Sequence, residues 1–95
     1  MYRYNVVIED YYRKNIGRIV ARATTIVEAR KVAYAEIGKT DDKAVSVYKQ
    51  KVGTSGPMDL IGEVQKWYSG KRFWYTEDGA KYPLNKDGSI GKRPR

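Results

Sequence analysis

The chain contains no cysteine and no histidine among its 95 residues. Without cysteine no disulfide framework can form, and we expect a reducing, cytoplasmic location. The commonest zinc ligands are missing, and so are the usual general base and the thiol nucleophile. The sequence therefore predicts a protein that is not an enzyme, holds no metal and needs no cofactor.

Long apolar runs are also missing. The N-terminal stretch alternates polar and apolar residues and lacks the apolar segment of a signal peptide. No later stretch reaches the length that a membrane-spanning helix needs. We therefore expect no membrane partner.

Positive charge and aromatic residues are abundant instead. Lysine and arginine number 19 against 11 acidic residues, which gives a formal net charge of +8. Hydrophobic residues make up 41% of the chain and aromatic residues 13%, which is too many for a disordered protein. A chain of this length fits one domain. We expect a single domain over residues 1–90, a flexible basic tail over 91–95, and an anionic partner.

Two strands are predicted at the start of the chain. Residues 2–9 alternate between apolar and polar side chains, which is the pattern of a half-buried strand. A polar connection that includes Gly17 follows, and alternation resumes over residues 18–23. The two runs therefore predict a β-hairpin.

A helix and a third strand follow the hairpin. Thr25 and Glu28 have the spacing of a capping box at a helix start, and Gly38 supplies the stop signal. Residues 44–50 then alternate again. A strand, helix, strand passage normally returns the chain to the same sheet, so the first strand should lie between the other two.

The second half reads as a β-meander. Strands are predicted near residues 61–68, 72–76 and 80–84, with glycine-containing turns between them. Pro83 argues that the last of these is an edge strand. The predicted fold is α+β: one helix packed on a three-stranded sheet, in the order strand, strand, helix, strand, followed by a C-terminal β-meander.

The sheet face opposite the helix is the first candidate binding surface. If Tyr4, Ile8 and Ile19 turn toward the helix, polar side chains occupy the other face. These are Arg3, Asn5, Arg18, Arg22 and Tyr48. Arginine binds phosphate through paired donors, and tyrosine offers a ring on which an unpaired base can stack. An ordinary solvated sheet face in a basic protein would have the same composition, so both interpretations stay open.

The segment from residue 66 to residue 75 is the second candidate, because cations alternate with large aromatic side chains there. We include Lys71, Arg72 and Trp74 among the candidate binding residues. The alternative is that the aromatic residues of this hairpin form the second half of the core, which their size favours. The sequence does not separate these two interpretations.

The tail adds three further cations, Lys92, Arg93 and Arg95. They can strengthen contact with a phosphate backbone without specifying sequence. Short basic ends also keep small proteins soluble, which is the alternative interpretation.

Residues 18–37 resemble the strand-to-helix passage of small sheet-type DNA-binding domains in mobile-element integrases. In those domains the helix follows three strands, whereas here it follows two. The resemblance implies DNA binding, but it assigns no family.

Two functions remain in competition. The first hypothesis is a small non-enzymatic protein that binds DNA or RNA with a basic and aromatic sheet face. The alternative is a protein-binding modulator or inhibitor, encoded by a phage or mobile element, whose cationic surface docks on an acidic or nucleic-acid-binding surface of a target. We expect a monomer, or a weak homodimer that forms through a sheet edge.

Overall fold

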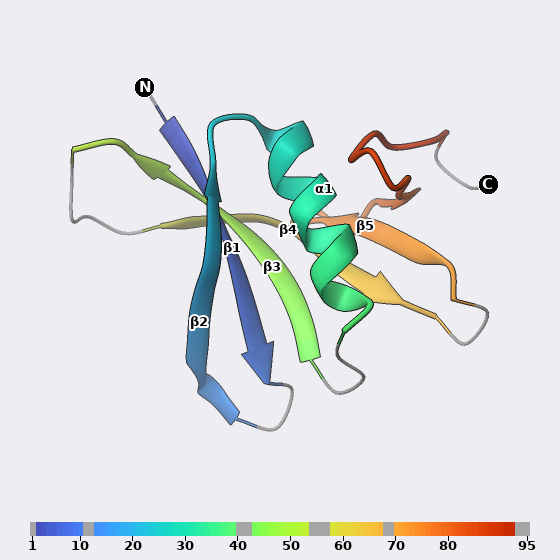
Figure 1. Cartoon of the computed structure of the whole chain (residues 1–95), viewed down its shortest axis with the longest axis horizontal. Helices are drawn as coiled ribbons and strands as arrows, with labels where there is room; N and C mark the ends of the chain where they lie inside the picture. The colour runs from blue at the N-terminus through green and yellow to red at the C-terminus, as the bar shows by residue number, and fades with distance from the viewer. Residues whose placement is uncertain (1, 11–12, 40–42, 54–57, 68–69, 93–95) are drawn as a thin grey trace.

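The computed structural model describes residues 2–10, 13–39, 43–53, 58–67 and 70–92. Within these ranges the chain forms six strands and one helix. In chain order they are β1 (Tyr2–Asp10), β2 (Arg13–Ala23), α1 (Ile26–Ile37), β3 (Lys43–Lys51), β4 (Asp59–Lys66), β5 (Arg72–Thr76) and β6 (Lys81–Pro83). All neighbouring strands are antiparallel, in the order β2-β1-β3-β4-β5-β6 (Figure 1). The predicted α+β class is confirmed.

The first half of the topology was also predicted correctly. β1 and β2 form a hairpin, α1 follows, and β3 pairs with the other edge of β1. The predicted separation of the meander from the three-stranded sheet needs a correction. β4 pairs directly with β3, and the strands β5 and β6 then extend the same sheet. Three strands would leave the edge of β3 unpaired, and the meander satisfies its backbone groups. Pro83 ends the edge strand β6, as predicted.

The helix begins as the capping box predicts. The Glu28 amide donates to the Thr25 hydroxyl oxygen at 3.2 Å, which satisfies one of the free amides of the first turn. The helix ends at Ile37, with Gly38 at the C-cap in a right-handed conformation, φ −70°. Gly38 is therefore not required for a left-handed turn. A Cβ at this position would lie 2.6 Å from Nη2 of Arg72, so the glycine leaves space for that side chain.

The core lies between α1 and one face of the sheet (Figure 1). It consists of Val6, Ile8, Ala23, Ala29, Ala33, Ile37, Val45, Val47, Val64, Trp74 and Leu84. The ring of Trp74 covers Gly62, where any side chain would overlap it. Alanines on the buried side of α1 allow the helix to approach the strands closely. In the described part of the chain, no helix has the length and apolarity that a membrane span requires.

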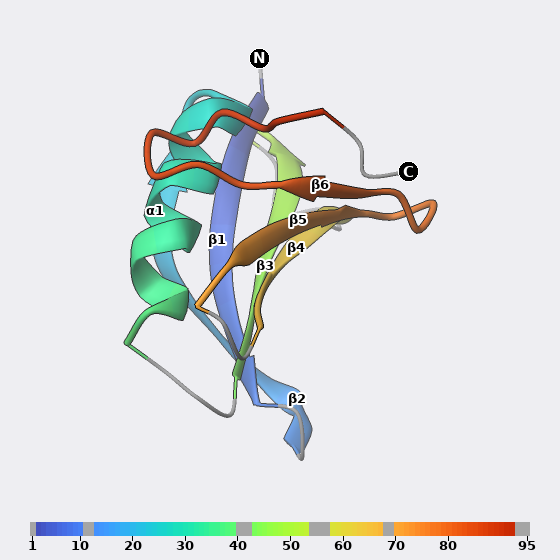
Figure 2. The same ribbon diagram turned by 90° about the vertical axis from the view of Figure 1, so that its right-hand side faces the viewer.

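The segment after β6 crosses α1 and closes the other side of the core (Figure 2). A bridge between Leu84 and Ile90 encloses a turn in which Gly88 adopts φ +90°. Nε of Arg30 donates to the Gly88 carbonyl oxygen at 2.8 Å. The guanidinium carbon of Arg30 also lies 5.6 Å from the ring centroid of Trp74, and burial lowers the pKa of Arg30. One buried arginine thus joins the helix, the sheet and the C-terminal segment.

Candidate functional site

The sheet face opposite α1, which we call the open face, is not covered by any helix in the described residues (Figure 2). Directly opposite residues of an antiparallel pair point to the same side of a sheet, so the registers identify what this face presents. One row, from β2 to β4, consists of Arg22, Asn5, Tyr48 and Leu60. The next row, from β2 to β6, consists of Ile19, Val7, Ser46, Glu63, Tyr75 and Lys81.

A β-bulge between β1 and β2 changes which residues of β2 belong to the open face. Val6 lies opposite Ala21, but the next residue, Val7, lies opposite Ile19. Val20 is therefore the extra residue, and it packs against the core. A bulge of this kind reverses the side to which every following residue of the strand points.

Two sequence predictions are wrong because of this bulge. Ile19 was expected to face the helix, but it lies beside Val7 on the open face and is 38% exposed. Arg18 was expected on the open face, but it lies opposite Ile8, whose side chain belongs to the core. Of these two β2 arginines, Arg22 therefore lies on the open face and Arg18 does not.

A polar network occupies one end of the open face, on β1 and β3. The Gln50 side-chain oxygen accepts from Asn5 Nδ2 at 3.0 Å and from Arg3 Nη2 at 3.4 Å. Asn5 Nδ2 also lies 3.0 Å from the Met58 sulfur, and Asn5 has no exposed surface. Within the described residues, Arg3 Nε and Asn5 Oδ1 are buried without a hydrogen-bond partner. This end of the face thus encloses one donor and one acceptor that no described group pairs with.

The other end of the open face holds an aromatic cluster, formed by Trp67, Phe73, Tyr75 and Lys81. The rings of Trp67 and Phe73 are 5.3 Å apart between centroids and tilted by 58°. The Trp67 indole nitrogen donates to the Tyr75 hydroxyl at 3.1 Å. The Lys81 ammonium lies 4.4 Å from the Trp67 centroid and 4.8 Å from that of Phe73. Trp67 is 46% exposed, so one large ring remains available to a ligand.

The aromatic hairpin contributes to both the core and the surface, as the alternation of its residues allowed. Phe73 and Tyr75 point to the open face, whereas Trp74 points to the helix and is only 2% exposed. The prediction that Trp74 belongs to a binding surface is therefore wrong. Its ring is enclosed by the core and by Arg30.

The remaining predicted residues are spread over the molecule. Tyr48 is half-buried on the open face, in the same row as Arg22. Lys71 is exposed and lies just before β5, and Arg72 lies on the helix side with its guanidinium carbon 4.1 Å from the ring centroid of Tyr34. Lys92 is exposed. Arg93 and Arg95 lie outside the described residues.

Lys81 was missed by the sequence reasoning, although a local signal existed. The turn after β5 has three residues and ends at Gly79, which adopts φ +91°. A three-residue hairpin loop that ends in a left-handed glycine fixes the register of its strands. That register places Lys81 opposite Tyr75 and so brings a cation to the aromatic cluster.

The described residues contain no group of three or more acidic, histidine or cysteine side chains placed to hold a metal ion. Comparisons with protein-family models, with curated proteins and with solved structures found no match. The function is therefore argued from the geometry of the open face alone.

Proposed function

We propose that this chain is a non-enzymatic protein that binds single-stranded nucleic acid on the open face. The observation that supports this proposal is the presence of an exposed Arg22, a half-buried Lys81 and an aromatic cluster on one sheet surface that no described helix covers. Aromatic rings stack on unpaired bases, and cations neutralise the phosphates between them. A duplex conceals the faces of its bases, so a single strand fits this surface better. The proposal includes a cytoplasmic location, in keeping with the absence of cysteine.

The two ends of the open face have different roles in the proposal. Arg22, on β2, is exposed and supplies a phosphate contact. A base stacked on Trp67 places its phosphate near the Lys81 ammonium. From β2, which holds Arg22, to β6, which holds Lys81, is five strand spacings, about 24 Å. One strand of several nucleotides can therefore contact both ends.

The direct test is a fluorescence anisotropy titration with labelled single-stranded DNA, single-stranded RNA and duplex DNA at several salt concentrations. We expect the single strands to bind more tightly than the duplex. The logarithm of affinity should fall with the logarithm of salt concentration, by about 0.7 per phosphate contact. Absence of binding at near-physiological salt would overturn the proposal.

The bulge in β2 provides a matched pair of variants. Arg18 and Arg22 are both exposed, lie on the same strand and have the same charge, but they point to opposite faces. Arg22→Ala should weaken binding and reduce the salt slope by roughly one contact. Arg18→Ala should have a much smaller effect. Equal effects of the two changes would mean that net charge alone, and not the open face, attracts the strand.

Trp67→Ala tests the stacking contribution. Loss of one base–aromatic stack should reduce the binding free energy by about 1–3 kcal/mol. The salt slope should stay the same, because no cation is removed. A change of slope without a change of affinity at low salt would argue against stacking on this ring.

A protein partner is the second candidate function, and a specific observation favours it. Exposed apolar side chains lie on the open face: Ile19 is 38% exposed, Met58 38% and Leu60 40%. Such side chains add little to phosphate contact but are common at the centre of protein interfaces, where tryptophan and arginine also contribute strongly. Recovery of one protein with an acidic surface from a nuclease-treated lysate, through wild type but not through Leu60→Asp, would favour this candidate.

A further inference from the structure

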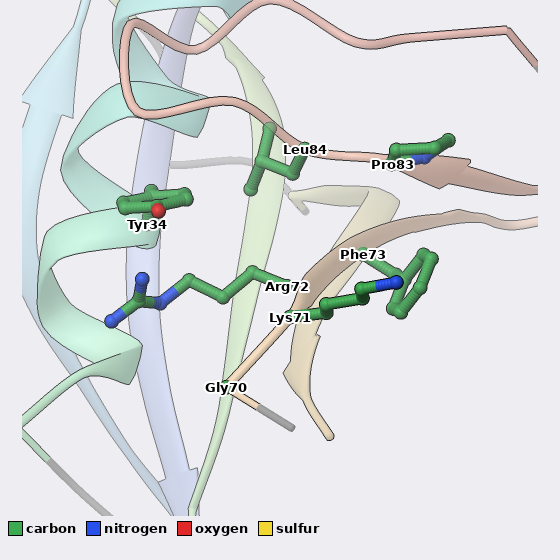
Figure 3. Close-up of a pocket in the computed structure, with 7 residues that line it drawn as sticks. All are labelled: Tyr34, Gly70, Lys71, Arg72, Phe73, Pro83 and Leu84. Atoms are coloured by element: carbon green, nitrogen blue, oxygen red, sulfur yellow. The ribbon is translucent and has the colours of Figure 1, made fainter. Parts of the chain in front are cut away.

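A pocket of about 440 Å³ lies between α1 and the β5–β6 hairpin and shares Phe73 with the aromatic cluster (Figure 3). It is lined by Tyr34, Gly70, Lys71, Arg72, Phe73, Pro83 and Leu84. The pocket forms where the chain leaves β6 to cross the helix. The Leu84 amide still donates to the Arg72 carbonyl oxygen at 3.0 Å. Residues 70 and 71, which precede β5, have no partner residue in β6, because β6 ends at Pro83.

Two cationic side chains border this pocket. The Arg72 guanidinium lies against the Tyr34 ring, and Lys71 extends on the other side, next to Phe73 (Figure 3). Nε of Arg72 is buried and has no hydrogen-bond partner among the described residues. No carboxylate in those residues forms an ion pair with either cation. A buried donor without an acceptor is unfavourable, so Arg72 is prepared for an external acceptor.

The position of Arg72 is fixed by its surroundings. Stacking on Tyr34 holds one face of the guanidinium, and Gly38 leaves space for Nη2. The last turn of α1 contains no basic residue, so the negative end of the helix also attracts this guanidinium. The fork of donors is therefore oriented before any ligand binds.

The opposite wall of the pocket is apolar, because Leu84 and Pro83 line it. A volume of about 440 Å³ is in the range of small-molecule sites. An arginine fork pairs with two oxygens of a phosphate, and a phosphate monoester has a charge of about −1.5 to −2 at pH 7, which a pocket bordered by two cations attracts. A carboxylate has only half of that charge and fewer acceptor oxygens.

We propose that this pocket binds a phosphate monoester of nucleotide size. The phosphate contacts Arg72, the organic part packs against Leu84 and Pro83, and Lys71 lies on the other side of the pocket (Figure 3). The ligand is either a free nucleotide or the terminal nucleotide of a strand. Phe73 belongs to both the pocket and the aromatic cluster, so a strand on the open face can end here. Only this second source depends on the proposed function.

The test follows the Nε–H resonance of Arg72 in ¹H–¹⁵N NMR spectra during titration with uridine 5′-monophosphate, uridine and inorganic phosphate. We expect a saturable shift with the monophosphate, a weaker one with inorganic phosphate, and none with uridine. If uridine shifts the resonance as much as its monophosphate, or if the monophosphate shifts nothing, the pocket does not bind phosphate and the proposal fails.

Variants check that the same residues hold the ligand. Arg72→Gln should weaken monophosphate binding about tenfold or more, because it removes a charge-assisted contact. Lys86→Ala removes one exposed charge in the turn after β6 and should leave the affinity unchanged. Gly38→Ala keeps every charge but displaces the guanidinium, so it should also weaken binding. If Arg72→Gln does not fold, Lys71→Ala takes its place, with a several-fold loss expected. Full affinity in all of the folded pocket variants would overturn the assignment.

Oligonucleotides with and without a 5′-phosphate distinguish the two sources. Tighter binding of the phosphorylated strand, lost in Arg72→Gln, identifies a strand end. Equal binding of both strands, with the monophosphate still bound, identifies a free nucleotide. If the monophosphate binds but no oligonucleotide does, the pocket stands and the proposed function fails.

Discussion

On the helix side of the sheet Val6, Val47 and Val64 have no exposed surface, and on the open face Asn5, the neighbour of Val6, has none either. The two faces therefore differ in chemistry more than in burial. The helix side excludes water with packed hydrocarbon, whereas the open face encloses an amide that hydrogen-bonds to Gln50. A buried amide with an unpaired oxygen does not add to stability.

The two tryptophans of the chain show the same contrast. Trp74 faces the helix and is 2% exposed, while Trp67 belongs to the open face and is 46% exposed. Burial of a large ring stabilises the fold in proportion to the area removed from water. The helix side should therefore determine stability, and the open face should determine binding.

The largest expected loss of stability comes from a substitution on the helix side. Trp74→Ala should lower the free energy of unfolding by about 3–5 kcal/mol, because it removes a buried ring and leaves a cavity under α1. Trp67→Ala should lower it by only about 1 kcal/mol, since half of that ring is already in water. Urea unfolding followed by far-UV circular dichroism measures both values. Similar losses in the two variants would refute the division between the faces.

A smaller loss of stability is expected at Gly62. A Cβ there would overlap the Trp74 ring and would lie 2.7 Å from the Tyr75 carbonyl oxygen, which is backbone and cannot move away easily. Gly62→Ala should lower the free energy of unfolding by about 1–3 kcal/mol through overpacking. Gly91→Ala is the control, because a Cβ at Gly91 meets Pro83 at an ordinary 3.5 Å. If the control is equally unstable, then the effect is one of glycine loss in general.

The first three strands and the helix start were predictable because their signals are local. The capping hydroxyl of Thr25 and the change of period after residue 23 are chemical features of the sequence itself. The bulge was not predictable in the same way. Val20 and Ala21 are both small and apolar, and nothing in their sequence marks where alternation is interrupted. The face assignment of Arg18 and Ile19 failed for that reason.

The position of the meander needed information that periodicity does not contain. Alternation in β5 separates Trp74 from Phe73 and Tyr75, but it does not say which side the helix covers. The side is decided by the pairing of β4 with β3, a contact between backbones. The pocket at Arg72 was unpredictable as a site for a related reason, because it joins a helix residue, Tyr34, to a strand that lies far along the sequence.

At the helix start, a change of about 1 kcal/mol is expected without any change in binding. Thr25→Ala removes the hydroxyl that accepts from the Glu28 amide, and loss of such a cap lowers stability by about 1 kcal/mol. Thr24→Ala is the matched control, since Thr24 is also exposed but does not cap the helix. Thermal unfolding of both variants gives the difference. A lower affinity for single strands in Thr25→Ala at a temperature where it is folded would contradict the independence of the two faces.

The smallest effect concerns the turn that closes the helix side. Ser89 donates to the Asp87 carboxylate from its hydroxyl at 2.6 Å and from its amide at 3.0 Å, and these bonds lower the pKa of Asp87 below its ordinary 3.8. Because the folded state favours the carboxylate, this contribution is complete above the ordinary pKa and is lost as the pH falls through the lowered one. Ser89→Ala should raise the pKa of Asp87 toward 3.8, as a ¹³C NMR titration of its carboxyl would show. An unchanged pKa would assign the shift to the backbone amides of residues 89 and 87 and to Lys31 instead of the Ser89 hydroxyl. Since Asp87 stays ionised at neutral pH in both proteins, strand binding on the open face should not change there.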